Sequence, residues 1–560
     1  MGAWSAVGLV LGLVMFLVSF APSLLPRRWL LQGLVGGFSA ATGYLVGFLL
    51  EMTVDAVMRL VDLDVQVSWH LPGGIWILAM LGVVVVIVGW WWSVREHRET
   101  ARLVGMTEQP PWRDIAATAV ALATMVLLMV LIRSVVLFTA WVSQGLDLFL
   151  PSVLSVVVAL IIALAVVRMV NRMVFQQALE RISRQADKLD RRRPRNLQPP
   201  QLPTRSGSAG SGQPWAELGR RGQIFTSCGP SAADIAAVLG GPSAEPIRVY
   251  ASLGDGAIEA AVEMAMAEVR RTGALDRGTL VIDTPAGRGW VDEFSVQAVE
   301  YLTGGDCATV SVQYSKLASA FVFLADPETP RACARALFAA LEEAIHDLPA
   351  GRRPKIYASG ESLGAYGGHG AFADADDMLA KVDGALWIGT PGITELARTI
   401  ARSRMRGSPE ITPVIDNGRH IRFATKPPEL VADAYGRPLG EWDVPRVVYL
   451  QHASDPMCRF NAELAWREPD WMRERAGSDV NTSLRWWPLV TWFQITTDML
   501  TSLDTPAGHG HIYEDELVPA WAAVLGRADA PITTITAAIR ASVEGLKASN
   551  SLTGSGNSAS

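Results

Sequence analysis

At 560 residues, the chain is too long for one ordinary domain. Half of its residues are hydrophobic, a share that is high for a soluble protein and indicates membrane-spanning segments. The formal net charge of −6 gives no overall excess of positive charge for binding nucleic acid, and the four scattered cysteines indicate reduced thiols rather than a disulfide framework or a zinc site.

Five apolar stretches in the first third of the chain are each long enough to cross a bilayer. They cover residues 4–25, 30–52, 75–92, 115–138 and 152–170. Tryptophans lie near their ends, as in the aromatic belts of membrane proteins, and glycines in the second stretch permit close helix packing. We therefore expect an α-helical membrane domain of about five spans over residues 1–170.

Loop charges predict how these spans are oriented. Arginine and lysine are concentrated in the first and third loops and after the fifth span, whereas the second loop has one arginine and the fourth has neither residue. The positive-inside rule then predicts a multi-pass plasma-membrane protein whose N-terminus lies outside and whose residues after 170 lie in the cytoplasm. Arg133, within the fourth span, is either a side chain that reaches the interface or a functional charge. The spans contain almost no acidic residues, which disfavours a proton-coupled pump.

Residues 171–214 are expected to link two domains. Their first part continues the fifth helix and ends in a basic run at 191–195, which is either a solvated charge run or a segment attracted to anionic lipid. Residues 196–214 are rich in glycine, serine and proline and predict a flexible tether.

From about residue 245, short β-branched runs alternate with helical patterns. Strands are predicted at 247–250, 279–283, 308–314, 355–359, 385–388 and 447–451, and helices at 257–271, 292–302 and 331–346. This alternation indicates a mainly parallel sheet covered by helices on both faces, so that we expect an α/β domain over residues 215–547. Residues 548–560 are expected to form a disordered tail.

The strand predicted at 355–359 leads into Gly-Glu-Ser-Leu-Gly at 360–364, the Gly-x-Ser-x-Gly pattern of a nucleophile elbow with Ser362 at its apex. The alternative is a structural turn whose serine caps a helix. In an elbow, the backbone N–H of Leu363 would stabilise an oxyanion, together with an N–H near Gly287 or Arg288. These two residues follow the strand predicted at 279–283, where a tight turn is the alternative.

A serine nucleophile needs a base and an acid that orients the base, and both should follow the serine in the chain. Asp455, just past the strand predicted at 447–451, is the candidate acid; the alternative is a turn-initiating residue before a proline. The histidines after Asp455 are His509 and His511, flanked by glycines. We favour His511 as the base, with His509 as the alternate, and expect His452 to be structural. No cluster at ligand spacing supports a metal site.

A tryptophan-rich insertion at about 457–505 separates the candidate acid from the candidate base. Its longest apolar run is too short to span a bilayer. The insertion is either core, a lid, or an interfacial patch that faces the membrane, and we favour lid or interface. A broad aromatic surface near the serine would suit an acyl chain.

Together, these motifs resemble those of an actinobacterial membrane-anchored α/β-hydrolase family, in which a multi-span N-terminal domain precedes a hydrolase domain. The resemblance rests on Pro-Ile-Arg-Val-Tyr at 246–250, Thr-Pro-Ala-Gly-Arg-Gly-Trp at 284–290, Gln-Tyr-Ser at 313–315, the elbow at 360–364, His-Ala-Ser-Asp-Pro at 452–456 and Gly-His-Gly-His-Ile-Tyr at 508–513. Ala286 and Arg288 depart from it, since threonines would be expected there. The resemblance covers nearly the whole chain and implies a serine hydrolase without naming a substrate.

We therefore expect a membrane-tethered serine hydrolase that cleaves an ester or thioester of a lipid or lipid-like substrate, because the site is tethered at a bilayer. Ser362, His511 and Asp455 would act through an acyl-enzyme. Two alternatives are an acyltransferase that uses the same triad and a membrane binding or transport component with an inactive hydrolase domain. We expect no cofactor and no nucleic-acid partner. The sequence leaves the substrate and the oligomeric state open.

Overall fold

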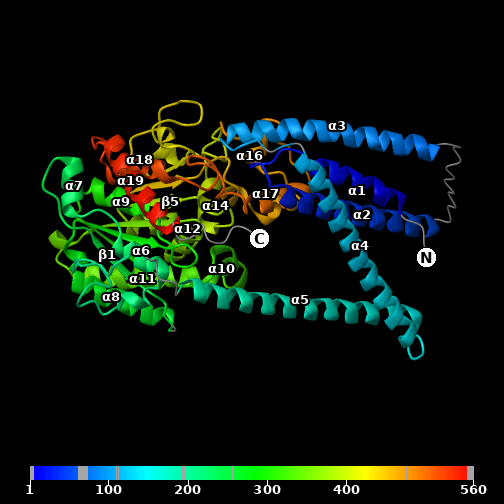
Figure 1. Cartoon of the computed structure of the whole chain (residues 1–560), viewed down its shortest axis with the longest axis horizontal. Helices are drawn as coiled ribbons and strands as arrows, with labels where there is room; N and C mark the ends of the chain where they lie inside the picture. Colours follow the sequence, from blue (N-terminus) through cyan, green and yellow to red (C-terminus); the bar gives the residue numbers. More distant parts are fainter. Residues whose placement is uncertain are drawn as a thin grey trace. The chain divides into compact units, whose positions relative to one another are not determined.

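The computed structural model describes residues 5–60, 74–108, 110, 112–190, 197–254, 256–474 and 477–551. The chain divides into two compact units. The first combines Met1–Ala178 with Phe460–Pro506, and the second combines Leu179–Arg459 with Ala507–Ser560. Figure 1 labels helices of both units and some strands of the second.

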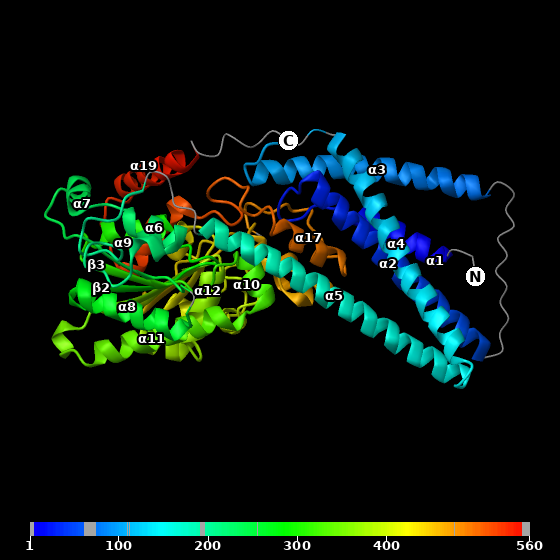
Figure 2. The ribbon, with the colours of Figure 1, turned by 60° about the horizontal axis from the view of Figure 1, so that its bottom comes forward.

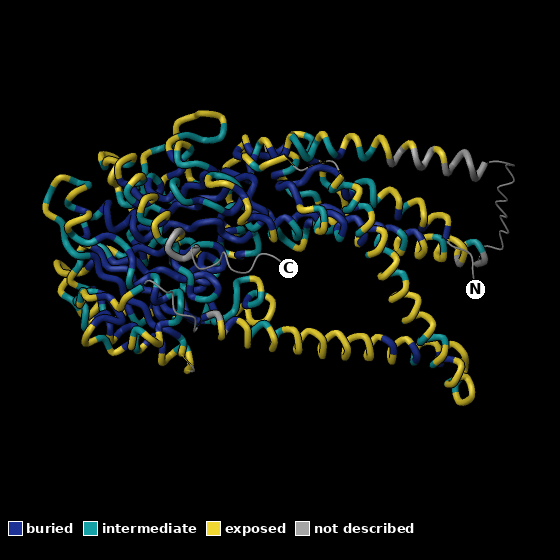
Figure 3. The backbone as a smooth tube through the Cα atoms, viewed as in Figure 1, coloured by how far each residue is buried: buried dark blue, intermediate teal, exposed yellow. Residues whose placement is uncertain are grey.

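Long helices dominate the first unit. They are α1 (Ala6–Val18), α2 (Trp29–Leu60), α3 (Gly74–Leu103), α4 (Trp112–Leu146) and α5 (Ser152–Asp190), which continues into the second unit. Three segments are long and apolar enough to cross a membrane, namely Trp29–Asp55, Trp112–Leu146 and Ser152–Ala186. α4 and α5 expose most of their apolar side chains, as helices surrounded by lipid would (Figure 3).

Among the described residues there are thus three candidate spans, whereas the sequence predicts five. The stretch predicted at 4–25 contains only the 13-residue helix α1, which is shorter than the roughly 20 residues that a crossing helix needs. The stretch predicted at 75–92 falls on α3, where most side chains between 75 and 86 lie outside the described residues.

Small residues let α2 pack closely on α1 and α4. A Cβ atom on Gly47 would lie 2.7 Å from the Gly8 Cα of α1, and a Cβ atom on Gly37 would lie 2.5 Å from the Thr124 Cβ of α4. Neither position has room for a side chain, so the glycines of the second predicted span do allow close helix approach.

The tryptophan-rich insertion folds with these helices, because residues 460–506 belong to the first unit. It contains α16 (Asp470–Arg473) and α17 (Val490–Asp498). Phe493 of α17 stacks on Phe38 of α2, with 5.7 Å between the ring centroids. Gln494 Nε2 donates a hydrogen bond of 3.0 Å to the Ala21 carbonyl oxygen, in the loop between α1 and α2.

A buried ion pair joins the end of α17 to the loop between α1 and α2. The side chains of Asp498 and Arg27 are fully buried, and Arg27 Nε lies 3.5 Å from Asp498 Oδ1. The other carboxylate oxygen accepts the backbone N–H groups of Leu24 and Leu25 at 3.1 and 3.3 Å, and the hydroxyl of Ser23. The insertion is therefore fixed to the α1–α2 loop by charge as well as by packing.

The core of the second unit is a sheet of seven parallel strands in the order β1-β3-β2-β4-β5-β7-β6. The strands are β1 (Ile247–Ala251), β2 (Thr279–Thr284), β3 (Cys307–Val312), β4 (Lys355–Glu361), β5 (Gly384–Ile388), β6 (Ile421–Ala424) and β7 (Arg446–Leu450). The predicted parallel sheet is confirmed, with β6 as a strand that the sequence did not reveal.

Helices cover both faces of this sheet (Figure 2). One face packs against α8 (Ile258–Thr272), α10 (Ser319–Ala325), α11 (Glu328–His346), α12 (Leu363–Gly368), α13 (Ala375–Lys381) and α14 (Glu395–Arg402). The other packs against α7 (Ala232–Leu239), α9 (Glu293–Leu302), α18 (Leu517–Leu525) and α19 (Ile532–Ser551). α6 (Gly219–Ser227) precedes the sheet and α15 (Pro456–Arg459) follows β7. The disordered tail was predicted at 548–560, but residues 548–551 form the end of α19. Residues 552–560 lie outside the described residues.

Residues 197–214 pack against β1 instead of forming the flexible tether that their composition predicts. Arg205 forms a β-bridge with Arg248 of β1, and the Ser206 N–H donates to the Arg248 carbonyl oxygen at 3.0 Å. The Gly212 N–H donates to Glu268 Oε1 at 2.9 Å. The prediction was wrong because composition does not reveal that the backbone pairs with a strand at the edge of the sheet.

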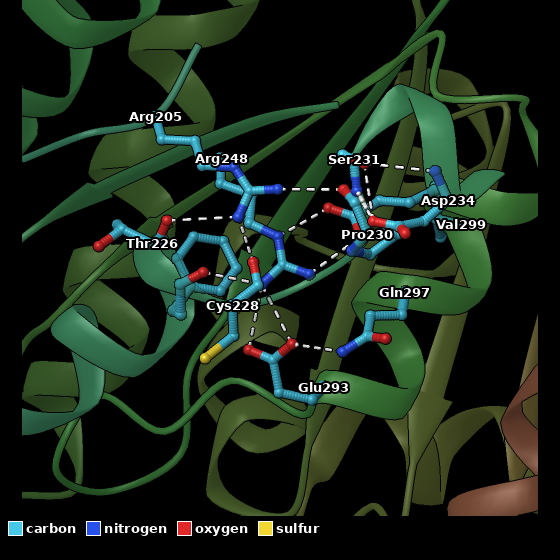
Figure 4. A network of polar contacts seen from close by, with 12 residues as sticks. Arg205, Thr226, Cys228, Pro230, Ser231, Asp234, Arg248, Glu293, Gln297 and Val299 are labelled. Carbon is cyan, nitrogen blue, oxygen red and sulfur yellow. Dashed lines mark hydrogen bonds and ion pairs between the residues drawn. The ribbon is translucent and has the colours of Figure 1, made fainter. Parts of the chain in front are cut away.

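A network of polar contacts secures this segment (Figure 4). The Arg205 guanidinium donates to the carbonyl oxygen of Cys228 and, at 3.1 Å, to that of Pro230. The Arg248 side chain is fully buried between two carboxylates, 3.1 Å from Glu293 and 2.7 Å from Glu300. Since an unpaired buried charge is costly, this pairing ties β1 firmly to α9.

Candidate active site

The serine of the Gly-x-Ser-x-Gly pattern lies at a sharp turn between β4 and α12. Ser362 has φ 55° and ψ −122°, a strained conformation for a residue with a side chain. A Cβ atom on Gly360 would lie 2.6 Å from the carbonyl carbon of Gly364, and one on Gly364 would overlap the Thr284 carbonyl oxygen. Both glycines are therefore sterically required, and the strand–turn–helix geometry of an elbow is present.

Asp455 and His511 form a buried pair beyond the end of β7. Asp455 Oδ2 lies 2.6 Å from His511 Nδ1, and the two side chains are 0% and 6% exposed. His511 Nε2 is also buried, and no described residue forms a hydrogen bond with it. An imidazole that is held through one nitrogen and free at the other has the arrangement that a general base needs.

Asp455 has further partners that fix its charge and position. Its Oδ1 accepts the Met457 N–H at 2.9 Å, so that it also initiates the turn into α15, and its Oδ2 accepts the Tyr513 hydroxyl at 2.7 Å. Burial alone would raise the pKa of Asp455, but the neighbouring His511 and these hydrogen bonds outweigh burial and hold that pKa below its usual value. Asp455 is therefore the ionised member of the pair.

Gly389 brings the His511 ring close to the elbow. It directly follows β5, which lies between β4 and β7 in the sheet. The Ser362 N–H donates to the Ile388 carbonyl oxygen at 2.9 Å, while a Cβ atom on Gly389 would lie 2.5 Å from His511 Cε1. The serine and the imidazole thus contact consecutive residues at the end of β5.

The structure brings His511, not His509, to Asp455. His509 is half-buried, and its backbone carbonyl accepts the Ile512 N–H at 3.3 Å. His452 supports the loop that carries both histidines: its Nδ1 lies 2.9 Å from the Gly510 carbonyl oxygen and its Nε2 lies 2.6 Å from Glu516 Oε2. This contact pattern fits the structural role expected for His452.

Three residues that hold the pair were missed from the sequence: Tyr513, Glu516 and Gly389. The Tyr513 ring stacks on His452 with 4.1 Å between the ring centroids, while its hydroxyl binds Asp455. The position of Tyr513, two residues after His511, could have indicated its role. The position of Gly389, at the end of a predicted strand, could have indicated that it lies near the site. Glu516 gave no signal, because its partner His452 is distant in the sequence.

The loop predicted to complete an oxyanion hole lies beside the elbow. β2 neighbours β4, and Gly364 packs directly on the Thr284 carbonyl group at the start of that loop. Gly287 has φ +46°, which favours glycine there. Leu363 is the first residue of α12, so its N–H belongs to the segment that the loop adjoins. The Arg288 carbonyl oxygen accepts a hydrogen bond of 3.0 Å from Gln313 Nε2.

Other carboxyl groups near the elbow have pKa values shifted in the opposite direction from that of Asp455. Burial raises the pKa of Asp283 and of Glu361, the residue before Ser362, well above the usual range, and raises that of Asp292 to about 7. Burial therefore favours the neutral carboxyl form of Asp283 and Glu361, whereas Asp455, which contacts the imidazole, favours the carboxylate. In the described part of the chain, no group of three or more His, Cys, Asp or Glu side chains is arranged to hold a metal ion.

Comparisons with known proteins cover both halves of the chain. The model of an alpha/beta-hydrolase family matches residues 247–537, and the model of an alpha/beta-hydrolase family N-terminus matches residues 20–230. No curated protein and no solved structure matches the chain significantly.

Proposed function

Because the chain belongs to this alpha/beta-hydrolase family, we propose that it is a membrane-tethered serine hydrolase that cleaves an ester or thioester. One observation carries the proposal: the buried His511 is paired with the ionised Asp455 through Nδ1, and its Nε2 forms no hydrogen bond with any described residue. The ring lies against Gly389, next to Ile388, whose carbonyl oxygen accepts the N–H of the strained Ser362. An inactive hydrolase domain would have no need to maintain this costly arrangement.

The proposed reaction passes through an acyl-enzyme. Ser362 Oγ attacks the carbonyl carbon of the substrate as His511 Nε2 removes the hydroxyl proton, and Asp455 stabilises the imidazolium that forms. The N–H of Leu363 and an N–H near Gly287 or Arg288 stabilise the oxyanion. His511 then gives its proton to the leaving alcohol or thiol. A water molecule then attacks the acyl carbon while His511 Nε2 takes its proton. The bond between Ser362 Oγ and the acyl carbon breaks, and His511 returns the proton to Ser362 Oγ as the acid leaves.

A lipid or lipid-like acyl ester is the proposed substrate, because the hydrolase half is joined to apolar helices. The proposal counts α3 as a further crossing beside the three candidate spans. Its cytoplasmic orientation draws support from the insertion, which binds the first loop through Asp498 and the end of α3 through Asn481, whose amide lies 3.1 Å from Glu96. The first and third loops, both rich in arginine, thus lie at one end of the first unit, as the positive-inside rule requires.

A fluorophosphonate probe, which labels activated serines covalently, tests the proposal on the full-length protein in isolated membranes. We expect labelling of the wild type and of His509→Ala, none of Ser362→Ala, and labelling of His511→Ala that is about a hundredfold slower, since a positioned base contributes about 10²–10⁴-fold. Undiminished labelling of Ser362→Ala would overturn the proposal. A larger decrease in the labelling rate for His509→Ala than for His511→Ala would reassign the base to His509.

A further inference from the structure

A cavity in the first unit lies where the end of α3 meets the insertion. Its volume is about 700 Å³, within the usual range for small-molecule sites. The α3 wall carries two tryptophans, three arginines and two glutamates, and the insertion contributes Asn481, Thr482 and Ser483. The two halves of the chain that match separate family models therefore build this cavity together.

Charge in the cavity is unevenly paired. Arg102 and Arg98 both contact Glu108, at 2.9 and 3.6 Å, and the Glu96 carboxylate accepts the Asn481 amide. Arg95, by contrast, forms no hydrogen bond or ion pair with any described residue. The lining thus has three arginines against two glutamates, and Arg95 is the arginine that no described carboxylate pairs with, which suits an anionic ligand.

The indole of Trp90 is a second group that lacks a partner. Its Nε1 is buried in the cavity wall, and no described residue accepts a hydrogen bond from it. Buried donors are nearly always satisfied, so this N–H calls for an acceptor that the protein does not itself supply. The hydroxyl groups of Thr482 and Ser483 on the opposite wall add further donors.

An apolar stripe on α3 leads to this cavity. Val84, Ile87, Val88 and Trp91 follow one another at helical spacing and are 53%, 57%, 58% and 64% exposed. Arg95 continues the same face one turn later. This placement rests on the proposed crossing of α3. Since tryptophans and then arginines mark the end of a membrane helix, the stripe would then lie at the depth of acyl chains and the cavity at the depth of lipid phosphates.

We infer that this cavity binds the phosphate of an anionic phospholipid, with Arg95, the Trp90 N–H and the Thr482 hydroxyl as ligands and an acyl chain along the stripe. Free phosphate offers the same oxygens, but only a lipid also covers the exposed stripe. The site is separate from the proposed chemistry at Ser362 and would bind lipid whether or not the chain is an active hydrolase.

Native mass spectrometry of the detergent-solubilised full-length protein measures binding directly. The probes are dioleoylphosphatidylglycerol, the zwitterionic dioleoylphosphatidylcholine, and inorganic phosphate as a competitor. We expect the wild type to bind phosphatidylglycerol at least about tenfold more tightly than phosphatidylcholine, and Arg95→Gln to lose that preference, since one charged hydrogen bond accounts for about a tenfold change. Arg95→Lys, which keeps the charge, should retain part of it.

The matched control is Arg172→Gln, which removes an equally exposed arginine from α5, away from the cavity. It should bind as the wild type does, and Thr482→Ala should weaken binding about threefold through one neutral hydrogen bond. The inference would be overturned if Arg95→Gln kept the wild-type preference for phosphatidylglycerol over phosphatidylcholine. It would also be overturned if Arg172→Gln lost this preference to the same extent as Arg95→Gln. Displacement of phosphatidylglycerol by millimolar phosphate, in an Arg95-dependent manner, would overturn the lipid assignment in favour of free phosphate.

Discussion

Replacing Gly389 with alanine tests whether the position of the His511 ring controls catalysis. The added methyl carbon would lie 2.5 Å from His511 Cε1 and 2.9 Å from Nδ1. Non-bonded carbon atoms prefer separations of about 3.5–4.0 Å, so the ring must move by roughly 1 Å. Asp455 holds Nδ1 at 2.6 Å, and that hydrogen bond must therefore lengthen or bend.

Two separate effects should follow. Gly389 has φ +53°, and an alanine there destabilises the fold by about 1–2 kcal/mol. A displacement of roughly 1 Å at a catalytic group lowers kcat/KM about a hundredfold, or ~2.7 kcal/mol of transition-state stabilisation. The first effect changes the free energy of unfolding, and the second changes activity.

Gly240→Ala is the matched control. Gly240 ends α7 with φ +74°, but no described atom lies within 4 Å of an added Cβ. The measurements are Tm and kcat/KM of the full-length protein for a p-nitrophenyl ester. Both variants should lose stability, and only Gly389→Ala should lose activity. Equal kcat/KM in the two variants would refute the reasoning.

Two further substitutions test contacts around the site and the insertion. Burial lowers the pKa of His452, but the hydrogen bond and charge of Glu516 outweigh burial and raise that pKa. The contact therefore contributes its full stabilisation of the fold below the unfolded-state pKa of about 6.5, and this contribution is lost as the pH rises through the folded-state pKa. The wild type should therefore unfold at a higher Tm than Glu516→Gln near pH 6, with a smaller difference near pH 9; a difference that does not change with pH would contradict this. Asp498→Ala should lower stability by about 3–5 kcal/mol in thermal unfolding of the full-length protein, because it removes the carboxylate that neutralises the buried Arg27 guanidinium. The control Asp504→Ala removes the exposed ion pair with Arg28 and should lower stability by at most about 1 kcal/mol. Equal losses of stability in the two variants would contradict a stabilising role for the buried pair.

Local patterns predicted the sheet and the elbow well. Short β-branched runs mark β1, β2, β3, β4, β5 and β7 because strands covered on both faces are continuously apolar. β6 escaped detection because it has only four residues and includes Arg422. That side chain is buried and donates to the carbonyl oxygens of Gly418 and Gly440, which sequence patterns do not reveal.

Contacts between residues that are distant in the sequence determine the features that could not be predicted. The sequence could not separate His509 from His511, because the choice depends on the turn at Gly510, which has φ +55°, and on its contacts with residues 452 and 454. The tether at 197–214 was mispredicted for a related reason: its partners, β1 and α8, come later in the chain.

The insertion has a consequence for dissecting the chain. Its first residue, Phe460, comes five residues after Asp455, and its last, Pro506, comes five before His511. A truncated chain that starts at residue 197 would keep the whole segment matched by the hydrolase model, yet it would lose the α2 ring that stacks on Phe493 and the arginine that neutralises Asp498. Such a fragment would keep the insertion, which lies between Asp455 and His511 in the chain, without the packing partners that it has in the first unit. Residues 460–506 should therefore be studied together with the N-terminal helices rather than in an isolated hydrolase fragment.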